Sequence, residues 1–127
     1  MVKKIIEFFE EHKKIPFIFM LIILGVMWYC SSLPGGSVGA SFSWMPVVYH
    51  LSIFAAFAFF FLVLVAKKRI KFREISLAII VSLIVAILDE FHQSFVPGRS
   101  CTIQDVLIDM TGATVMIIAC FLIKNYK

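Results

Sequence analysis

The amino-acid sequence predicts an all-α membrane protein, in which an amphipathic helix at the membrane surface precedes a bundle of four transmembrane helices. Of its 127 residues, 61% are hydrophobic and 16% are charged, and the mean hydropathy is +0.99; in soluble domains about a quarter of the residues are charged. The apolar residues fall into four runs, each close to the roughly 20 residues that a helix needs to cross the hydrocarbon core. A soluble bundle would need polar helix faces, and residues 54–66 and 75–88 offer almost none. We therefore predict one transmembrane domain over residues 1–127.

The amphipathic helix is predicted for residues 2–14, because Val2, Ile5, Ile6 and Phe9 fall on one side of a helix and charged residues on the other. Such a helix lies in the plane of the membrane surface. A charged extension of the first transmembrane helix fits the same pattern, so both interpretations stay open. Acidic residues interrupt the segment, and no small-residue cleavage site follows it, so we do not expect a cleaved signal peptide.

The first two transmembrane helices are predicted over residues 15–33 and 46–66. Pro34 and the two glycines after it end the first helix, since this sequence is typical of turns. Pro46 fits the first turn of the second helix, where its missing N–H group would have no helical partner. The basic connection 67–73 that follows is short, so the second and third helices should be antiparallel neighbours.

The third and fourth transmembrane helices are predicted over residues 74–95 and 103–123. The apolar part of the third run ends at Leu88, so a full span has to include the polar residues that follow. Residues 96–99, Val-Pro-Gly-Arg, are typical of a β-turn with Pro and Gly in its central positions. Residues 102–105, Thr-Ile-Gln-Asp, resemble a capping box at the start of the fourth helix.

The distribution of basic residues predicts how the protein lies in the cell membrane. Eleven of the twelve Lys and Arg residues flank the cytoplasmic ends of the predicted helices, and Arg99 is the exception. The positive-inside rule therefore places both termini in the cytoplasm and the loop containing Arg99 outside. Because these basic residues are explained by membrane topology, the net charge of +4 is not taken to indicate a nucleic-acid partner.

Seven polar residues fall at similar depth near the predicted outer surface, on three helices and one turn. Charged groups within a membrane domain usually face a bundle interior or a watery cavity. We expect these residues to form an outward-facing acidic pocket between the second, third and fourth helices. An excess of carboxylates can be relieved by protonation, by a metal ion or by an amine-bearing ligand. The candidates for catalysis are Glu90, His50 and Asp109, and the candidates for ligand binding are Asp89, Gln93, Arg99 and Asp105.

Structural roles could also account for some of these residues. Asp105 could serve only as a helix cap, and Arg99 could pair with Asp89 or Glu90 to hold the turn. A divalent metal is possible, but no spacing here is a metal-binding signature, so the cofactor is left undetermined. Separate thiols are favoured over a disulfide between Cys30 and Cys101.

The sequence resembles the VanZ-like family of small polytopic membrane proteins. The resemblance covers residues 28–120 and rests chiefly on the motif Glu-x-x-Gln-x-Phe-x-Pro-Gly-Arg at residues 90–99, which no general rule of helix packing requires. Matching positions outside this motif are Ser31, Ser32, Pro34, His50, Asp89, Asp105, Val106, Gly112 and Ala113.

The founding member of this family is associated with resistance to the lipoglycopeptide teicoplanin. The resemblance therefore implies that the pocket binds or modifies a lipid, a glycan or a lipoglycopeptide of the cell envelope, with membrane lipids as neighbours. Two positions depart from the family pattern, Val47 for a common Lys and Asp109 for a common Asn, and both make the cluster more acidic. The alternatives are a proton- or ion-coupled transporter and a noncatalytic membrane assembly or partner protein.

Overall fold

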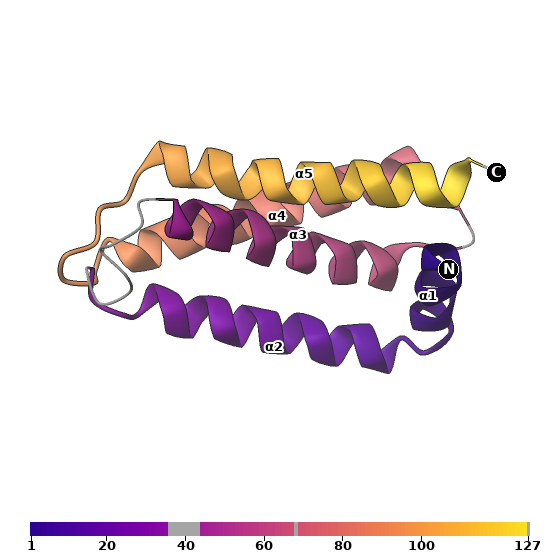
Figure 1. Ribbon diagram of the computed structural model, residues 1–127, viewed down its shortest axis with the longest axis horizontal. Coiled ribbons are helices and arrows are strands. Elements are labelled where there is room, and N and C mark those ends of the chain that lie inside the picture. Colours follow the sequence, from indigo (N-terminus) through magenta and orange to yellow (C-terminus); the bar gives the residue numbers. More distant parts are fainter. Residues whose placement is uncertain (36–43, 68, 127) are drawn as a thin grey trace.

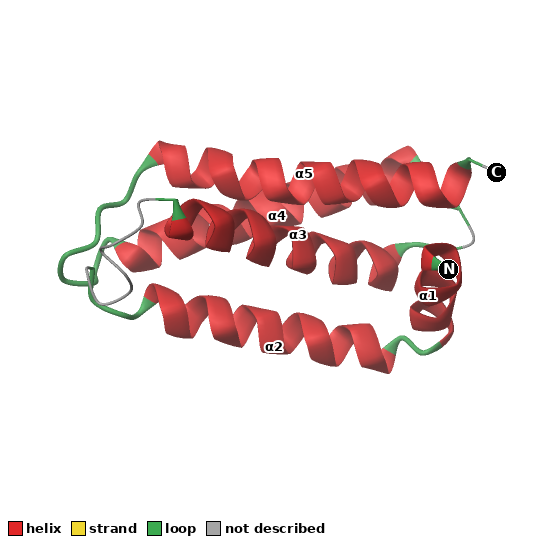
Figure 2. Ribbon diagram, in the orientation of Figure 1, coloured by secondary structure: helices red, strands yellow, loops and turns green. Residues whose placement is uncertain are grey.

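The computed structural model describes residues 1–35, 44–67 and 69–126 of the protein, and this part of the chain is helical apart from its connections (Figures 1 and 2). Four of the helices are long and apolar enough to cross a membrane. The predicted fold class, with four spans after a short N-terminal helix, is therefore confirmed. In chain order the helices are α1 Val2–Glu11, α2 Lys14–Ser31, α3 Met45–Val65, α4 Phe72–Gln93 and α5 Ile103–Asn125.

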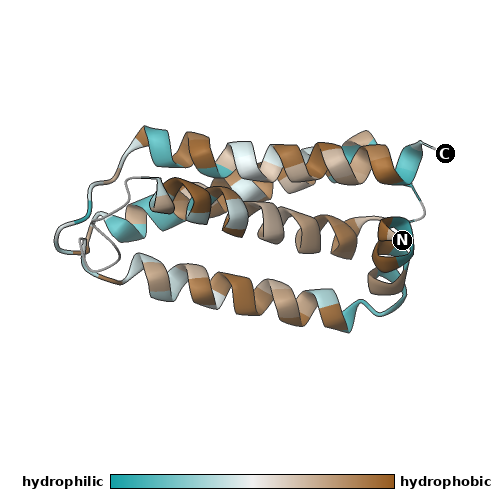
Figure 3. Cartoon of the chain, viewed as in Figure 1, coloured by the Kyte–Doolittle hydropathy of each residue, from teal (hydrophilic) through white to brown (hydrophobic). Residues whose placement is uncertain are grey.

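The four long helices run side by side, and α1 lies across one end of the bundle (Figure 1). Both termini lie at that end, which we call the Lys124 end; the opposite end, where α4 is followed by the turn at residues 96–99, is the Arg99 end. Figure 3 shows hydrophilic residues gathered toward the two ends and hydrophobic residues along the middle of the helices. This distribution is what a bundle with its middle in hydrocarbon requires.

Lys13 sets the corner between α1 and α2. Its Nζ donates hydrogen bonds to the carbonyl oxygens of Val63, Leu64 and Ala66, at 2.5, 2.9 and 2.9 Å. These carbonyls lie in and after the last turn of α3, where they lack helical partners and where a cation also suits the helix dipole. Burial lowers the pKa of the Lys13 ammonium. Helix α1 accordingly ends at Glu11, short of the predicted residue 14, because the chain turns to bring this lysine onto α3.

Helix α4 begins at Phe72, two residues before the predicted start at residue 74. The backbone N–H of Lys71 donates to Glu74 Oε2 at 3.0 Å, so the glutamate caps the helix from its third position. At the same end, the side chain of Asn125 bonds both the N–H and the carbonyl of Ile70. The end of α5 is thereby joined to the connection between α3 and α4.

The apolar core lies mainly between α3 and α5, which make the most extensive helix contact in the described chain. Gly112 of α5 permits this contact, because a Cβ atom there would lie 2.2 Å from the carbonyl oxygen of Leu51 on α3. Small residues at such contacts let helix backbones approach closely within membranes. The buried apolar residues of these helices and α4 include Phe54, Phe57, Ala58, Leu62, Ala78, Ala86, Ala113 and Ile117.

Helix α2 contributes little to this core, since its buried residues are Pro16, Met27 and Ser31. Its sides present large apolar residues to the surroundings, among them Phe17, Ile22 and Val26. The helix packs mainly on α3, and polar contacts at its two ends add to this attachment. Those at the Lys124 end involve Lys13, and those at the Arg99 end are part of the candidate site.

We predict that Gly112→Ala destabilises the protein by about 1–3 kcal/mol, the usual effect of overpacking a tight contact. The measurement is the thermal unfolding midpoint of the purified protein in detergent. Gly25→Ala is the matched control, because nothing lies within 4 Å of a Cβ atom at that position of α2, and alanine has the better helix propensity. Equal midpoints for the two variants would contradict the close α3–α5 contact.

Candidate functional site

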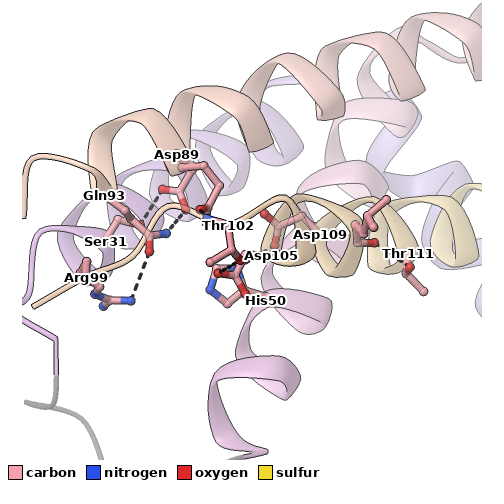
Figure 4. Close-up of polar contacts among 11 residues, drawn as sticks. Ser31, His50, Asp89, Gln93, Arg99, Thr102, Asp105, Asp109 and Thr111 are labelled. Atoms are coloured by element: carbon pink, nitrogen blue, oxygen red, sulfur yellow. Dashed lines mark hydrogen bonds and ion pairs between the residues drawn. The ribbon is translucent and has the colours of Figure 1, made fainter.

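A buried carboxylate, Asp89 of α4, links three segments at the Arg99 end (Figure 4). Ser31 Oγ of α2 donates to Asp89 Oδ1 at 2.5 Å, and Gln93 Nε2 donates to Asp89 Oδ2 at 2.8 Å. Arg99 Nη1 lies 3.4 Å from Gln93 Oε1. Asp89 and Gln93 come together because they are four residues apart on one helix face. The network fixes the outer part of α4 against the last turn of α2.

Arg99 joins the turn after α4 to the end of α2. Its Nε donates to the carbonyl oxygen of Leu33 at 3.1 Å, and its Nη2 donates to the carbonyl oxygen of Cys30 at 2.9 Å. These carbonyls are at a helix C-terminus, where a cation is favoured. The ion pair with Asp89 or Glu90 that the sequence also allowed is not formed, since the described residues include no salt bridge of Arg99.

The predicted β-turn at residues 96–99 is present, with the Arg99 N–H donating to the Val96 carbonyl at 3.1 Å and φ of +75° at Gly98. The turn packs against Gly35, whose N–H donates to the Pro97 carbonyl at 3.0 Å. A Cβ atom on Gly35 would lie 1.7 Å from the Gly98 carbonyl oxygen. Glycine is therefore required at both positions, by the backbone angle at one and by the close approach at the other.

The start of α5 differs in part from the predicted capping box. The Asp105 N–H donates to Thr102 Oγ1 at 3.2 Å, as expected for an N-cap threonine. The reciprocal bond is absent: Asp105 Oδ2 accepts from the threonine hydroxyl at 2.8 Å, and Glu90 Oε2 of α4 accepts the Thr102 backbone N–H at 2.9 Å. The helix-capping carboxylate thus comes from the preceding helix, which only the folded hairpin can supply.

His50 of α3 and Asp109 of α5 form a buried pair. The Nδ1 atom lies 2.8 Å from Asp109 Oδ1, and the two residues are 5% and 0% exposed. The edge of the Tyr49 ring also contacts the imidazole, with ring centroids 5.5 Å apart. A carboxylate at Nδ1 fixes the orientation of the ring and turns Nε2 to the opposite side. The contact with Asp109 therefore uses Nδ1 and leaves Nε2 as the other ring nitrogen of this cavity-lining residue.

Several buried oxygen atoms in this region have no hydrogen-bond partner among the described residues. Asp109 Oδ2 is the clear case, whereas Glu90 Oε1 and the Tyr49 hydroxyl lack nitrogen or oxygen partners but lie near the thiols of Cys101 and Cys30. Leaving a buried polar atom unpaired costs about 1–3 kcal/mol, and more for a charged group. Unpaired acceptors at this position are consistent with a bound donor, such as a water molecule, a hydroxyl group or an ammonium group.

A cavity of about 420 Å³ lies beside these groups. Four of the seven predicted site residues line it, namely His50, Gln93, Arg99 and Asp105. Asp89, Glu90 and Asp109 are buried and are not among its lining residues. Helix α2 also contributes to the wall, which the prediction of a pocket from three helices did not include. The remaining lining residues are Cys30, Ser31, Pro34, Gly35, Met45, Pro46, Tyr49, Gly98 and Ser100.

Sequence reasoning from residue chemistry missed Ser31 and Tyr49 as parts of this site. Ser31 was noted only as a position that matches the family pattern. Its place near the end of an apolar run puts it at a depth similar to that of Asp89, which could have suggested it as a hydrogen-bond partner of that carboxylate. His92, next to the site in sequence, lies outside the cavity: its ring stacks on Trp28 at 3.8 Å, and its Nε2 lies 2.9 Å from Ser32 Oγ.

The site is rich in acceptors and poor in free cations. Four carboxylates gather here, and Arg99 is engaged by backbone carbonyls. Among the described residues, no three His, Cys, Asp or Glu side chains are arranged to hold a metal ion, and all three cysteines are free thiols. The arrangement suits a ligand that donates hydrogen bonds, and His50 can act as its proton carrier.

We predict that His50→Ala destabilises the protein by about 3–5 kcal/mol, because it leaves a buried carboxylate without its partner. Asp109→Asn should lose much less, since an amide oxygen can still accept from Nδ1. The measurement is thermal unfolding of both variants in detergent. Equal unfolding temperatures for the two variants would contradict the interpretation that His50 compensates the buried charge of Asp109.

Comparison with known proteins identifies the family to which the chain belongs. No curated protein and no solved structure matched the chain. The family model for VanZ/LLP1 matches residues 7–124, a range that contains the Asp89 network, the turn with Arg99 and the His50–Asp109 pair. The match spans nearly the whole chain and agrees with the resemblance drawn from residues 90–99, so this membrane protein belongs to the VanZ/LLP1 family.

Proposed function

We propose that the cavity at the Arg99 end binds the polar part of an amphiphilic cell-envelope molecule, such as a lipid-linked glycan or a lipoglycopeptide of the teicoplanin type. The observation that carries this proposal is a cavity of about 420 Å³ at the end of a transmembrane bundle, walled by a carboxylate, an imidazole and an amide. Ligand pockets in proteins commonly measure about 300–1,000 Å³.

The chemistry of the wall favours hydroxyl and amine groups over anionic groups. Asp105 offers a carboxylate to the cavity, whereas the guanidinium of Arg99 already donates to the carbonyl oxygens of Cys30 and Leu33 and to Gln93 Oε1. Sugars and amino sugars carry such donors. Apolar residues at the rim, including Met45 and Pro46, can contact the acyl or polyprenyl chain of the same molecule.

Modification of the ligand is a further part of the proposal and rests on His50. With Nδ1 held by Asp109 at 2.8 Å, the imidazole can accept a proton at Nε2 from a ligand hydroxyl while the carboxylate stabilises the imidazolium. Glu90 is a weaker candidate, because it does not line the cavity and already accepts the Thr102 N–H. We therefore assign the proton-transfer role to His50 and a positioning role to Asp109 and Glu90.

The two alternatives differ in how much the structure supports them. Proton or ion transport is less favoured, because Ser82 is the one buried polar residue that the described chain places between its two ends. A noncatalytic assembly role is more compatible, since Asp89 and Arg99 both serve to hold the hairpin against α2. Ligand binding distinguishes the assembly role from the proposed function.

We predict that the purified protein in lipid nanodiscs binds teicoplanin and that Asp105→Asn weakens this binding about tenfold, because hydrogen bonds to a charged group contribute about 1.5–3 kcal/mol. The asparagine oxygen can still accept from the Thr102 hydroxyl, so the helix cap is preserved. The measurement is the dissociation constant by calorimetry, with the deacylated glycopeptide as the second ligand.

Lys14→Gln is the control for this experiment, since it removes a charge at the Lys124 end from an exposed residue that does not line the cavity. It should leave the dissociation constant unchanged. Equal dissociation constants for the acylated and deacylated glycopeptides would exclude a contribution of the lipid chain to binding. Absence of binding in a protein that unfolds cooperatively would remove the lipoglycopeptide ligand and favour the assembly role.

The positive-inside rule supports a plasma-membrane orientation with the Arg99 end outside, and we propose that topology.

Cys101 is exposed and lies in the connection before α5. We predict that a variant with Cys101 as its one cysteine reacts with a membrane-impermeant maleimide in intact cells. Desolvation and the neighbouring Glu90 raise the pKa of the Cys101 thiol, so labelling at pH 7 should be slower than for an ordinary exposed thiol and should become faster at pH 8.

A cysteine introduced at Lys4 serves as the control for labelling from the opposite side. It should react only after the cells are permeabilised. If Lys4→Cys reacts in intact cells and Cys101 does not, the orientation is the opposite of the one proposed.

A further inference from the structure

A second cavity, of about 710 Å³, lies at the Lys124 end of the bundle, far from the candidate site along the helices. Helix α1 forms one wall, and the segments at the ends of α3 and α5 form the other. The two walls differ in charge. The α1 side carries three carboxylates and one cation, Glu7, Glu10, Glu11 and Lys3, and is acidic on balance, whereas Lys67, Arg69 and Lys124 line the opposite side.

Part of this charge is used to hold the fold together. The Nζ of Lys124, which is 5% exposed, contacts Glu10 Oε1 and donates to the Lys67 carbonyl at 2.6 Å. Lys13, also at this cavity, is bound to the end of α3. These contacts dock α1 onto the bundle, and the Lys124–Glu10 pair joins the two walls on one side of the cavity.

The remaining charges have no partners of opposite sign within the described chain. Glu7 and Glu11 are exposed on the α1 wall, and neither forms a salt bridge there. Lys67 and Arg69 are exposed on the other wall and likewise form none. Opposite charges that face a common cavity without touching each other can be bridged by a molecule that carries both signs.

We propose that this cavity binds the head group of an aminophospholipid, with the phosphate against Lys67 and Arg69 and the primary ammonium against Glu7 and Glu11. An ammonium group donates hydrogen bonds to carboxylates, and a guanidinium binds phosphate with matched geometry. A phospholipid that lacks the ammonium meets two unpaired carboxylates. A phospholipid with a quaternary ammonium cannot donate to them.

The surroundings favour a membrane lipid over a free phosphoester. Helix α1 exposes Val2, Ile5 and Phe8, as expected for a helix lying in the membrane interface. The start of α2 exposes Phe17 and Ile18 beside it. Acyl chains can lie along these apolar residues while the head group enters the cavity. The proposal is independent of the function assigned to the cavity at the Arg99 end.

The test compares three short-chain lipids with the same acyl chains, added to the purified full-length protein in detergent. They are a phosphatidylethanolamine, a phosphatidylcholine and a phosphatidylglycerol, and the measurement is the dissociation constant by calorimetry. We expect the phosphatidylethanolamine to bind about tenfold more tightly than either of the others. Similar affinities for all three lipids would overturn the proposal.

Paired variants show which wall recognises which group. Lys67→Gln with Arg69→Gln should weaken phosphatidylethanolamine binding about tenfold. Glu7→Gln with Glu11→Gln should abolish the preference for phosphatidylethanolamine over phosphatidylglycerol, a change of selectivity that a loss of stability alone would not produce. Lys4→Gln with Lys14→Gln is the control, because it removes the same amount of positive charge outside the cavity. It should leave the dissociation constants for phosphatidylethanolamine and phosphatidylglycerol unchanged.

Two results would contradict specific parts of this assignment. A preference that survives Glu7→Gln with Glu11→Gln would exclude the ammonium site on α1. Glycerophosphoethanolamine, which has the head group without acyl chains, should bind at least about tenfold more weakly. Equal binding of this soluble compound would exclude a membrane lipid as the occupant.

Discussion

The Arg99 end of this protein depends on one buried carboxylate. An ionised group inside a membrane-embedded bundle is tolerated only when donors surround it, and Asp89 obtains them from Ser31 on α2 and Gln93 on α4. The hydrogen bond from Ser31 thereby joins the end of α2 to α4, in addition to the packing of α2 on α3. The position of that end in turn offers the carbonyls of Cys30 and Leu33 to Arg99.

The engagement of Arg99 changes the chemistry of the neighbouring cavity. A free guanidinium there would favour phosphate or carboxylate ligands. Here Nε and Nη2 donate to carbonyls at the end of α2 and Nη1 contacts Gln93, while Asp105 and His50 line the same cavity. The other end of the bundle is arranged differently, because α1 and the basic segments place both signs of charge around one cavity. An apolar middle separates these two polar ends.

Local chemistry explains which features could be predicted. Hydropathy indicated four spans, because crossing hydrocarbon demands about 20 apolar residues whatever their neighbours. The turn at residues 96–99 was predictable since Pro97 and Gly98 restrict their own backbone angles. The cap at Thr102 was predicted in part: its hydroxyl accepts from its own helix, but the acceptor of its N–H is Glu90 from another helix. No sequence spacing specifies such a contact.

The sequence by itself determined that the chain is an all-helical membrane protein, how its helices divide, and which polar residues share a depth. Tertiary structure alone decided how those residues pair: Asp109 with His50, Asp89 with Ser31, and Arg99 with backbone carbonyls instead of a carboxylate. The physical reason is that hydropathy and turn preferences act within a segment. Hydrogen-bond partners depend on the rotation and depth at which separate helices pack, and the contact of Gly112 with Leu51 is one of the contacts that set them.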